Sequence, residues 1–310
     1  MKAAVLHAFG EAPVVEEYAE PTAGAGQEVV EVVAAGINPV DLLIASGRFY
    51  GPTPQLPAPV GSEAVVRRAD GSLGYVSKAA TGTLAERALV NVGSVIDLPE
   101  GIEHGQAIAA GIAGLAAWGG LEHGGRLAAG EKVLVLGASG AVGQIAVQVA
   151  RVLGAGRVVG AARSAGGIAR LERLGLDAVV AIEEGGEWGE RLTAAADGGF
   201  DVCLDLLWGL PFLAALGAMA PLGRIVQVGN AAAPEVGFPA GALRGRNLSL
   251  IGYTSMRLAP ETMATTYRSV AARIASGDVK IELDELPLEQ VGFAWSRQAD
   301  SPHRKLIIVP

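Results

Sequence analysis

Short apolar runs separated by turn residues dominate the first hundred positions of the chain. Residues 28–35 (EVVEVVAA) come close to the alternation that is typical of a half-buried strand, and residues 38–46 change to a helical pattern. Residues 49–61 (FYGPTPQLPAPVG) contain four prolines, which predicts a loop. The strands predicted in this part of the chain are 2–9, 14–18, 28–35, 60–67 and 83–90.

Beyond residue 100 the pattern changes. Residues 104–128 are rich in alanine and glycine and favour helix, and from residue 132 apolar strands alternate regularly with helices. The predicted strands are 132–136, 157–162, 178–182, 201–207, 224–228 and 248–252, and the helices among them are 142–153, 167–174, 188–195 and 212–220. Apolar strands separated by helices predict a parallel sheet buried on both faces. Six such strands predict an α/β protein with a doubly wound, dinucleotide-binding (Rossmann) sheet.

The end of the chain returns to a strand-rich pattern. A helix is predicted over 261–276, followed by the strand-like segments 281–288 (IELDELPL) and 305–310 (KLIIVP). We expect this tail to join the β structure of the first hundred residues, so that this domain is discontinuous. The expected domains are therefore 1–110 with 256–310, and 111–255.

The strongest sequence signal is the strand–turn–helix segment 132–150 (KVLVLGASGAVGQIAVQVA). Glycines at such a turn allow a tight bend and a close approach of the backbone to a ligand, and the start of the helix favours a pyrophosphate. The spacing is G-x-x-G-x-x-G, and glycines that only pack a helix on a sheet remain the alternative. The predicted cofactor-binding residues of this turn are Gly137, Ser139, Gly140, Ala141, Val142 and Gly143.

The second strand indicates which dinucleotide is bound. NAD sites usually have an Asp or Glu at its end, but here Arg163 and Ser164 follow the strand. A positive charge and a hydroxyl suit a 2′-phosphate, and Arg170 lies close enough along the next helix to join them. This favours NADPH over NADH, with a single exposed arginine as the alternative reading of Arg163. Val228, Gly229 and Asn230 end the fifth strand, at the sheet edge where ligands bind in this topology.

Composition and charge exclude several classes of binding partner and of structural site. The formal net charge is −8, with 24 basic and 32 acidic residues, and we expect neither nucleic acid nor a membrane surface as partner. The single cysteine, Cys203, excludes an intramolecular disulfide framework and a multi-cysteine zinc site. No apolar stretch long enough to span a membrane and no signal-peptide pattern are visible, so a cytoplasmic protein is expected.

Several segments together resemble the medium-chain dehydrogenase/reductase superfamily, and specifically its zinc-free quinone oxidoreductase branch. They are MKAAVLHAFGEAPVVEE, AAGINPVDLLIASGRFY, PVGSEAVV, GASGAVGQIAVQVA and RGRNLSLIGYT. The resemblance covers nearly the whole chain. It implies a GroES-like β domain built from both chain ends, a Rossmann domain, and an active site between them.

The resemblance also implies chemistry without a metal. Zinc-dependent relatives have a Cys and a His-Glu pair where this chain has Asn38 and Ser62-Glu63, and the four histidines are scattered, so we expect no metal. Asn38 and Tyr50 are then the candidate catalytic residues, since an amide or a phenol can stabilise or protonate a reduced oxygen. Asp41 is expected to orient a neighbour, and Lys305 is expected to touch the cofactor.

These observations predict an NADPH-dependent reductase that transfers hydride to quinones or to α,β-unsaturated carbonyl compounds. The alternative is a non-catalytic NADPH-binding sensor or structural protein with the same fold. It draws support from the shortened segment 63–83 and from Ala116, which occupies the place of a threonine that many relatives have near the nicotinamide. A homodimer is predicted through the apolar sixth strand, 247–253 (NLSLIGY), with Leu243 and Met256 adding buried area.

Overall fold

The computed structural model describes residues 1–183 and 188–310, and it divides the chain into two compact units. The β unit consists of residues 1–113, 260–277 and 281–310. The nucleotide unit consists of residues 114–259 and 278–280. Within the described residues, no helix is long and apolar enough to cross a membrane.

The nucleotide unit is built on a parallel sheet of six strands in the order β11-β10-β9-β12-β13-β14. Along the chain these strands are β9 (Lys132–Leu136), β10 (Arg157–Ala162), β11 (Ala178–Ala181), β12 (Phe200–Asp205), β13 (Met219–Gln227) and β14 (Ser249–Gly252). The order reverses between β9 and β12, which is the point where ligands bind in doubly wound sheets. The predicted doubly wound parallel sheet is therefore confirmed.

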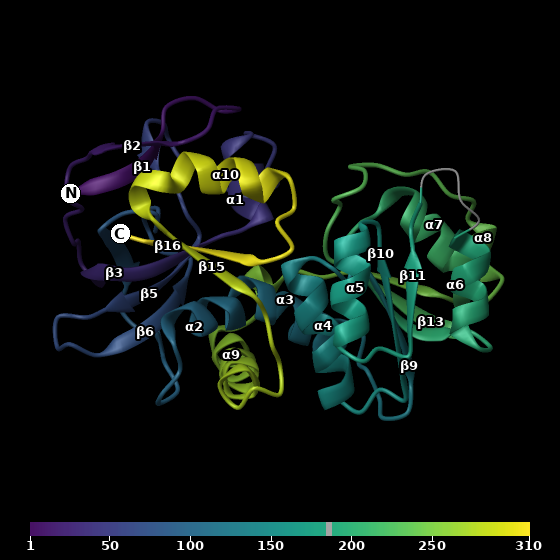
Figure 1. Ribbon diagram of the computed structural model, residues 1–310. Coiled ribbons are helices and arrows are strands. Elements are labelled where there is room, and N and C mark those ends of the chain that lie inside the picture. Colours follow the sequence, from purple (N-terminus) through teal and green to yellow (C-terminus); the bar gives the residue numbers. More distant parts are fainter. Residues whose placement is uncertain (184–187) are drawn as a thin grey trace. The chain divides into compact units, whose positions relative to one another are not determined.

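Helices cover both faces of this sheet (Figure 1). The helices and helical turns of this region are α3 (Ile112–Gly119), η1 (Gly120–Gly124), α4 (Ala141–Val152), α5 (Ala165–Arg173), α6 (Trp188–Ala196), α7 (Gly209–Ala218), α8 (Gly241–Arg244) and η2 (Ser255–Arg257). Helices α4 and α5 lie on one face and α6 and α7 on the other (Figure 1). On the second face Leu134, Leu192 and Phe212 pack in one buried apolar cluster, which explains why these strands are apolar throughout.

The β unit contains two sheets, with strand orders β2-β1-β4 and β15-β16-β3-β5-β6-β8, and β7 pairs with β3. The strands are β1 (Lys2–Leu6), β2 (Val14–Glu17), β3 (Gln27–Ile37), β4 (Ala58–Pro59), β5 (Glu63–Arg67), β6 (Leu73–Ser77), β7 (Arg87–Asn91), β8 (Ile96–Asp97), β15 (Leu283–Pro287) and β16 (Lys305–Val309). The helices are α1 (Pro39–Ala45), α2 (His104–Ala110), α9 (Pro260–Ala275), η3 (Leu288–Gln290) and α10 (Val291–Ala299).

The end of the chain pairs with the beginning, as the sequence pattern predicts. Strand β16 runs antiparallel to β3, with Leu306 opposite Ile37 and Ile308 opposite Ala35. In Figure 1 the yellow C-terminal strands lie among the purple and blue N-terminal ones. Trp295 of α10 packs into the same buried cluster as Leu306. The β unit is therefore discontinuous in sequence.

Three local predictions differ from the structure. The helix expected over 212–220 is α7, which ends at Ala218 because Met219 pairs with Phe200 and already belongs to β13. Strand β7 begins at Arg87, four residues later than expected. Helix α10 was not predicted; its buried residues Val291, Ala294 and Trp295 follow helical spacing, but the segment is too short for the pattern to stand out.

Candidate functional site

The glycine turn of the nucleotide unit joins β9 to α4. Gly137 has φ +77°, a backbone conformation that favours glycine, and its N–H and that of Ala138 both donate to the Ala161 carbonyl of β10 at 3.1 and 3.0 Å. Gly140 is the N-cap of α4 and has extended backbone angles. The turn is thus tied to the sheet and leads directly into a helix start, where the first N–H groups have no partner within the helix.

Gly140 and Gly143 lack side chains for different reasons. A Cβ on Gly143 would lie 2.4 Å from the Gly137 carbonyl oxygen and 2.5 Å from the Ala138 Cα, so packing of the helix on the turn excludes it. Apart from its neighbours in the chain, a Cβ on Gly140 would meet one atom of the described residues within 4 Å, the Gly137 oxygen, at 3.5 Å. The protein itself therefore leaves room at Gly140. A cradle that a Cβ would fill is what close approach of a pyrophosphate to the backbone requires.

The end of β10 and the start of α5 lie against the glycine turn. Ser164 is the N-cap of α5, and its hydroxyl accepts a hydrogen bond from the Gly167 N–H at 3.1 Å. A Cβ on Gly167 would lie 2.7 Å from the Cβ of Ser139, so Ser139 and Ser164 flank the same glycine. Arg163 is exposed and Arg170 is half-buried. The structure thus places a cation, two hydroxyls and a helix start beside the turn.

The carboxyl ends of β12 and β13 meet at the same edge of the sheet. The N–H groups of Val228 and Gly229 donate to the Asp205 carbonyl at 2.9 and 3.2 Å, and Asn230 is exposed. The Asp205 side chain is buried, and its Oδ1 accepts from the N–H groups of Leu207 and Trp208. Burial raises the pKa of this carboxyl group. Asp205, which the sequence analysis did not select, fixes the backbone next to the switch point.

A buried polar cluster occupies the β unit, and Glu63 at the start of β5 is its centre. Its Oε1 accepts hydrogen bonds from Asn38 Nδ2 at 2.8 Å and from Lys305 Nζ at 2.7 Å. Its Oε2 accepts from the Tyr75 hydroxyl at 2.8 Å and from the Ile112 N–H at 2.7 Å. Four donors occupy the two oxygens, which is the full complement of an ionised carboxylate.

Lys305 supplies the positive charge of this cluster. Its ammonium donates to Asn38 Oδ1 at 2.6 Å and to the Ile37 carbonyl at 3.3 Å as well as to Glu63, and the residue is 2% exposed. All three of its donors are used. Lys305 was expected at the cofactor; its contacts within the β unit are to protein groups.

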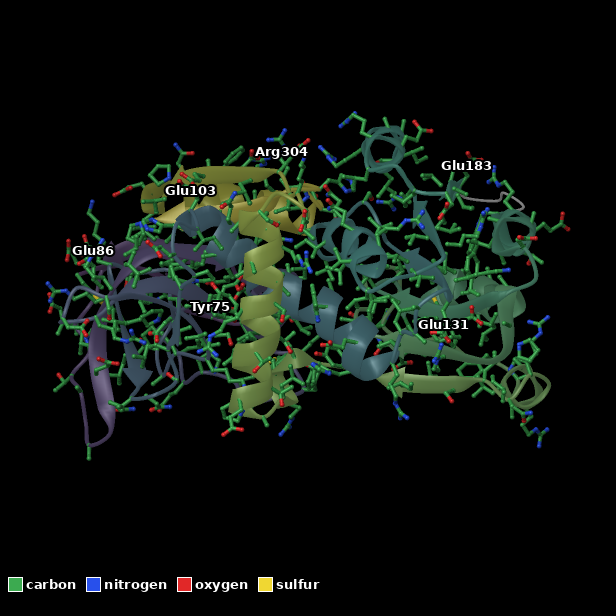
Figure 2. All side chains as sticks on the ribbon, turned by 90° about the horizontal axis from the view of Figure 1, so that it is seen from below. Tyr75, Glu86, Glu103, Glu131, Glu183 and Arg304 are labelled. Carbon is green, nitrogen blue, oxygen red and sulfur yellow. The ribbon has the colours of Figure 1, made fainter. Side chains whose placement is uncertain are left out.

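Two glycines and two tyrosines enclose the ion pair. A Cβ on Gly36 would lie 2.4 Å from Glu63 Oε1, and one on Gly111 would lie 2.3 Å from Glu63 Oε2. Tyr75 stacks on Tyr267 of α9 with ring centroids 4.4 Å apart, and Figure 2 shows Tyr75 beside that helix. Burial is the main reason that the pKa of the Tyr75 hydroxyl is raised. The cluster is therefore buried and closely packed.

The two predicted catalytic residues lie in different environments. Asn38 is 3% exposed, and its amide bridges Glu63 and Lys305. Tyr50 is 74% exposed, and its ring packs on Phe49 with centroids 4.6 Å apart. The structure thus brings Asn38 into the polar cluster and leaves Tyr50 on the surface of the same unit.

Sequence reasoning gave too little weight to Glu63 and Asp41. Glu63 begins the apolar run EAVV and Lys305 begins the apolar run KLIIV. A charged residue in a buried strand requires a partner, and this rule could have linked the two. Asp41 is 2% exposed and accepts from the Asn38 N–H at 2.7 Å, as an orienting residue would.

Comparison with known proteins places the chain in a family. Residues 141–273 match the family described as zinc-binding dehydrogenase. The chain is 30% identical to the quinone oxidoreductase of Homo sapiens over 308 residues, which cover 95% of this chain and 92% of that protein. The chain therefore belongs to the quinone oxidoreductase branch of the medium-chain dehydrogenase/reductase superfamily, and it is an oxidoreductase with the expected Rossmann and GroES-like β domains.

Two further relatives show the range of this family. The crystal structure of the quinone oxidoreductase from Thermus thermophilus, described together with its NADPH complex, is 30% identical, with a TM-score of 0.83 and complete coverage of both chains. The mycocerosic acid synthase-like polyketide synthase of Mycolicibacterium smegmatis is 30% identical over 314 residues, covering 93% of this chain and 14% of that protein. Relatives of this chain thus include proteins of similar length and a segment of a much longer protein.

Proposed function

We propose that the protein is an NADPH-dependent reductase that transfers hydride to quinones or to α,β-unsaturated carbonyl compounds. The observation that carries this proposal is the glycine turn, which is open at Gly140 and lies beside Arg163 and Ser164. The quinone oxidoreductase of Thermus thermophilus is described in complex with NADPH, which supports the same cofactor here.

The proposed cofactor site uses the backbone for the pyrophosphate and side chains for the 2′-phosphate. The start of α4 at Gly140–Val142 would hold the pyrophosphate, and Arg163, Ser164 and Arg170 would hold the 2′-phosphate. Residues 228–230 would lie along the rest of the dinucleotide at the carboxyl edge of β13. When bound, the reduced nicotinamide supplies the hydride.

The choice of NADPH over NADH is tested by Arg163→Ala. Loss of a charge-assisted contact costs about 1.5–3 kcal/mol, so NADPH affinity is expected to fall about ten- to a hundredfold while NADH affinity stays the same. The two affinities are measured by titration calorimetry on the wild type and the variant. An equal loss for both cofactors would show that Arg163 has only a structural role.

The substrate class is tested with acceptors. Oxidation of NADPH is followed with a panel of quinones and a panel of enones, since relatives include quinone oxidoreductases and polyketide synthases. Oxidation that depends on either acceptor class supports the reductase. Binding of NADPH without any acceptor-dependent oxidation would instead support a non-catalytic sensor or structural protein.

We also propose that the reaction proceeds without zinc, because the polar cluster does not suit this metal. The ammonium of Lys305 lies 2.6 Å from Asn38 Oδ1 and 2.7 Å from Glu63 Oε1, so these oxygens already bind a cation. Zinc sites in proteins are dominated by Cys and His ligands. Among residues 1–183 and 188–310, no three His, Cys, Asp or Glu side chains form a group that could hold a metal ion. Stoichiometric zinc in the purified protein would contradict this proposal.

A homodimer through β14 is the last part of the proposal. Strand β14 ends the sheet order, and within the described residues it pairs with β13 alone. A second copy related by a two-fold axis could pair with the open edge, helped by Leu243 and Met256. Leu250→Lys, which puts a charge at the strand centre, is expected to give monomers in sedimentation. A monomeric wild type at micromolar concentration would disprove the dimer.

A further inference from the structure

Asp41 and Ser62 form a short contact at the border of the buried polar cluster. The Ser62 hydroxyl donates to Asp41 Oδ1 at 2.5 Å, and the Asn38 N–H donates to Asp41 Oδ2 at 2.7 Å. Asp41 is 2% exposed, whereas Ser62 is half-buried. Ser62 is therefore the link between a buried carboxyl group and the surface of the β unit.

The charges of the cluster set Asp41 apart from Glu63. The negative charge of Glu63 is balanced by the ammonium of Lys305 at 2.7 Å. Among the residues that the structure describes, the hydrogen-bond partners of the Asp41 carboxyl group are the Ser62 hydroxyl and the Asn38 N–H, and neither is a cation, so its ionisation adds an unbalanced negative charge to the buried cluster. Burial is the main reason that the pKa of Asp41 is raised, to about 6. The negative charge of Glu63 also raises this pKa, whereas the hydrogen bonds from Ser62 and Asn38 and the positive charge of Lys305 lower it.

The hydrogen bonds also fix where a proton on Asp41 would lie. Oδ2 faces the Asn38 N–H, which is a donor in every protonation state. The proton must therefore lie on Oδ1, which faces the Ser62 hydroxyl. When Asp41 is protonated, the direction of this hydrogen bond reverses, and the Ser62 hydroxyl is free to donate to a group outside.

We propose that Asp41 stores the proton that the reaction consumes and that Ser62 delivers it to the reduced substrate. This inference rests on the proposed reductase function. Hydride transfer to a quinone or an enone leaves negative charge on the substrate oxygen as an electron pair. That pair takes the proton of the Ser62 hydroxyl, Ser62 Oγ takes the proton from Asp41 Oδ1, and the Asp41 carboxylate regains a proton from water after product release.

In this arrangement Ser62 is the proton donor and Asp41 is a positioning residue that acts through it. The other candidate donor in the β unit, Tyr50, is 74% exposed and packs on Phe49. A general acid contributes most when its pKa lies near the working pH, which a carboxyl group with a pKa of about 6 satisfies.

The first test measures the protonation of Asp41 directly, in the absence of cofactor and turnover. The infrared C=O stretching band of protonated carboxyl groups is followed across pH in the intact protein. A band that titrates near pH 6 is expected in the wild type. In Ser62→Ala, which loses a hydrogen bond that lowers the pKa of Asp41, the band is expected to titrate at higher pH, and in Asp41→Asn it is expected to be lost. Asp70→Asn is the control, because Asp70 lies in an exposed turn, where the Ser72 hydroxyl and N–H lower its pKa.

The second test measures, through kcat/KM, whether the proton reaches the substrate. Asp41→Asn keeps the hydrogen bonds, because its amide can donate to Ser62 Oγ and accept from the Asn38 N–H as protonated Asp41 would. Asp41→Asn and Ser62→Ala are each expected to lower kcat/KM for the acceptor by about a hundredfold, and Ser62→Thr, which keeps a hydroxyl, is expected to restore most of it. The wild-type kcat/KM should fall as pH rises through about 6, and Asp41→Asn should lose this dependence.

The outcomes separate the relay from the reductase. A wild type that turns over but has no carboxyl band titrating near pH 6, or an Asp41→Asn variant with the wild-type pH profile, would overturn the relay and leave the reductase standing. If none of the quinones or enones makes the wild type oxidise NADPH, the proposed function fails, and the relay fails with it.

Discussion

The glycine turn of the nucleotide unit and the polar cluster of the β unit are built in opposite ways. The turn consists of backbone from one continuous segment, residues 137–143, and it leaves space at Gly140. The cluster consists of side chains from five distant segments, represented by Asn38, Glu63, Tyr75, Tyr267 and Lys305, and it is filled. The turn leaves space beside its backbone, whereas the cluster is packed around its own charged groups.

This difference predicts how each region responds to substitution. A change at Gly140 should affect binding of a ligand and leave folding nearly intact, because no protein atom depends on that space. A change at Glu63 should affect folding, because four donors lose their acceptor inside a buried cluster.

The largest effect is expected for Glu63→Gln. Removing one charge of a buried ion pair leaves the other uncompensated, so the free energy of unfolding is expected to fall by about 3–5 kcal/mol, measured by urea denaturation. Glu289→Gln is the matched control: it breaks the Lys2–Glu289 pair, which has nearly the same length, 2.8 Å against 2.7 Å, but whose side chains are 49% and 58% exposed. This control should leave stability unchanged. Equal losses in both variants would mean that burial does not distinguish the two pairs.

Gly140→Val is expected to weaken NADPH binding by about a hundredfold or more, because a branched side chain would fill the space that the pyrophosphate needs. The free energy of unfolding should fall by about 1 kcal/mol or less, the scale of an N-cap change. Gly143→Ala gives the opposite result, a clear loss of stability, because its Cβ would lie 2.4 Å from the Gly137 oxygen. Tight NADPH binding by Gly140→Val would place the phosphate site elsewhere.

The last effect concerns Asp41 and the pH dependence of stability. The pKa in the folded protein, about 6, lies above the ordinary value of 3.8, so the folded state binds the extra proton between these values. Stability therefore falls as pH rises from about 4 to 6, and the cost of the ionised group persists above pH 6. Asp41→Asn should remove this cost and stabilise the protein at pH 7 by up to about 3 kcal/mol, with no gain at pH 4. A gain that does not depend on pH would contradict this assignment.

Local patterns predicted most of the nucleotide unit. All six strands of the sheet were expected in their order along the chain, because each is an apolar run bounded by a helix, and the glycine turn is contiguous. The predicted end of α7 was wrong, because Met219 pairs with Phe200, and this tertiary contact overrides the helical pattern of the sequence. In the β unit the sequence indicated the return of the C-terminal strand but not the register that brings Lys305 to Glu63.

The sequence by itself determined the elements whose signal is local. Burial requires the apolar pattern of the strands and helices, and the backbone geometry of the turn requires its glycines. Only the tertiary structure decided which polar residues share a site. Asn38, Glu63 and Lys305 are separated by up to 267 residues along the chain, and they meet because β3, β5 and β16 are neighbours in one sheet. The contact of Asp41 with Ser62 and its raised pKa likewise follow from burial beside an already balanced ion pair, which a linear pattern does not show.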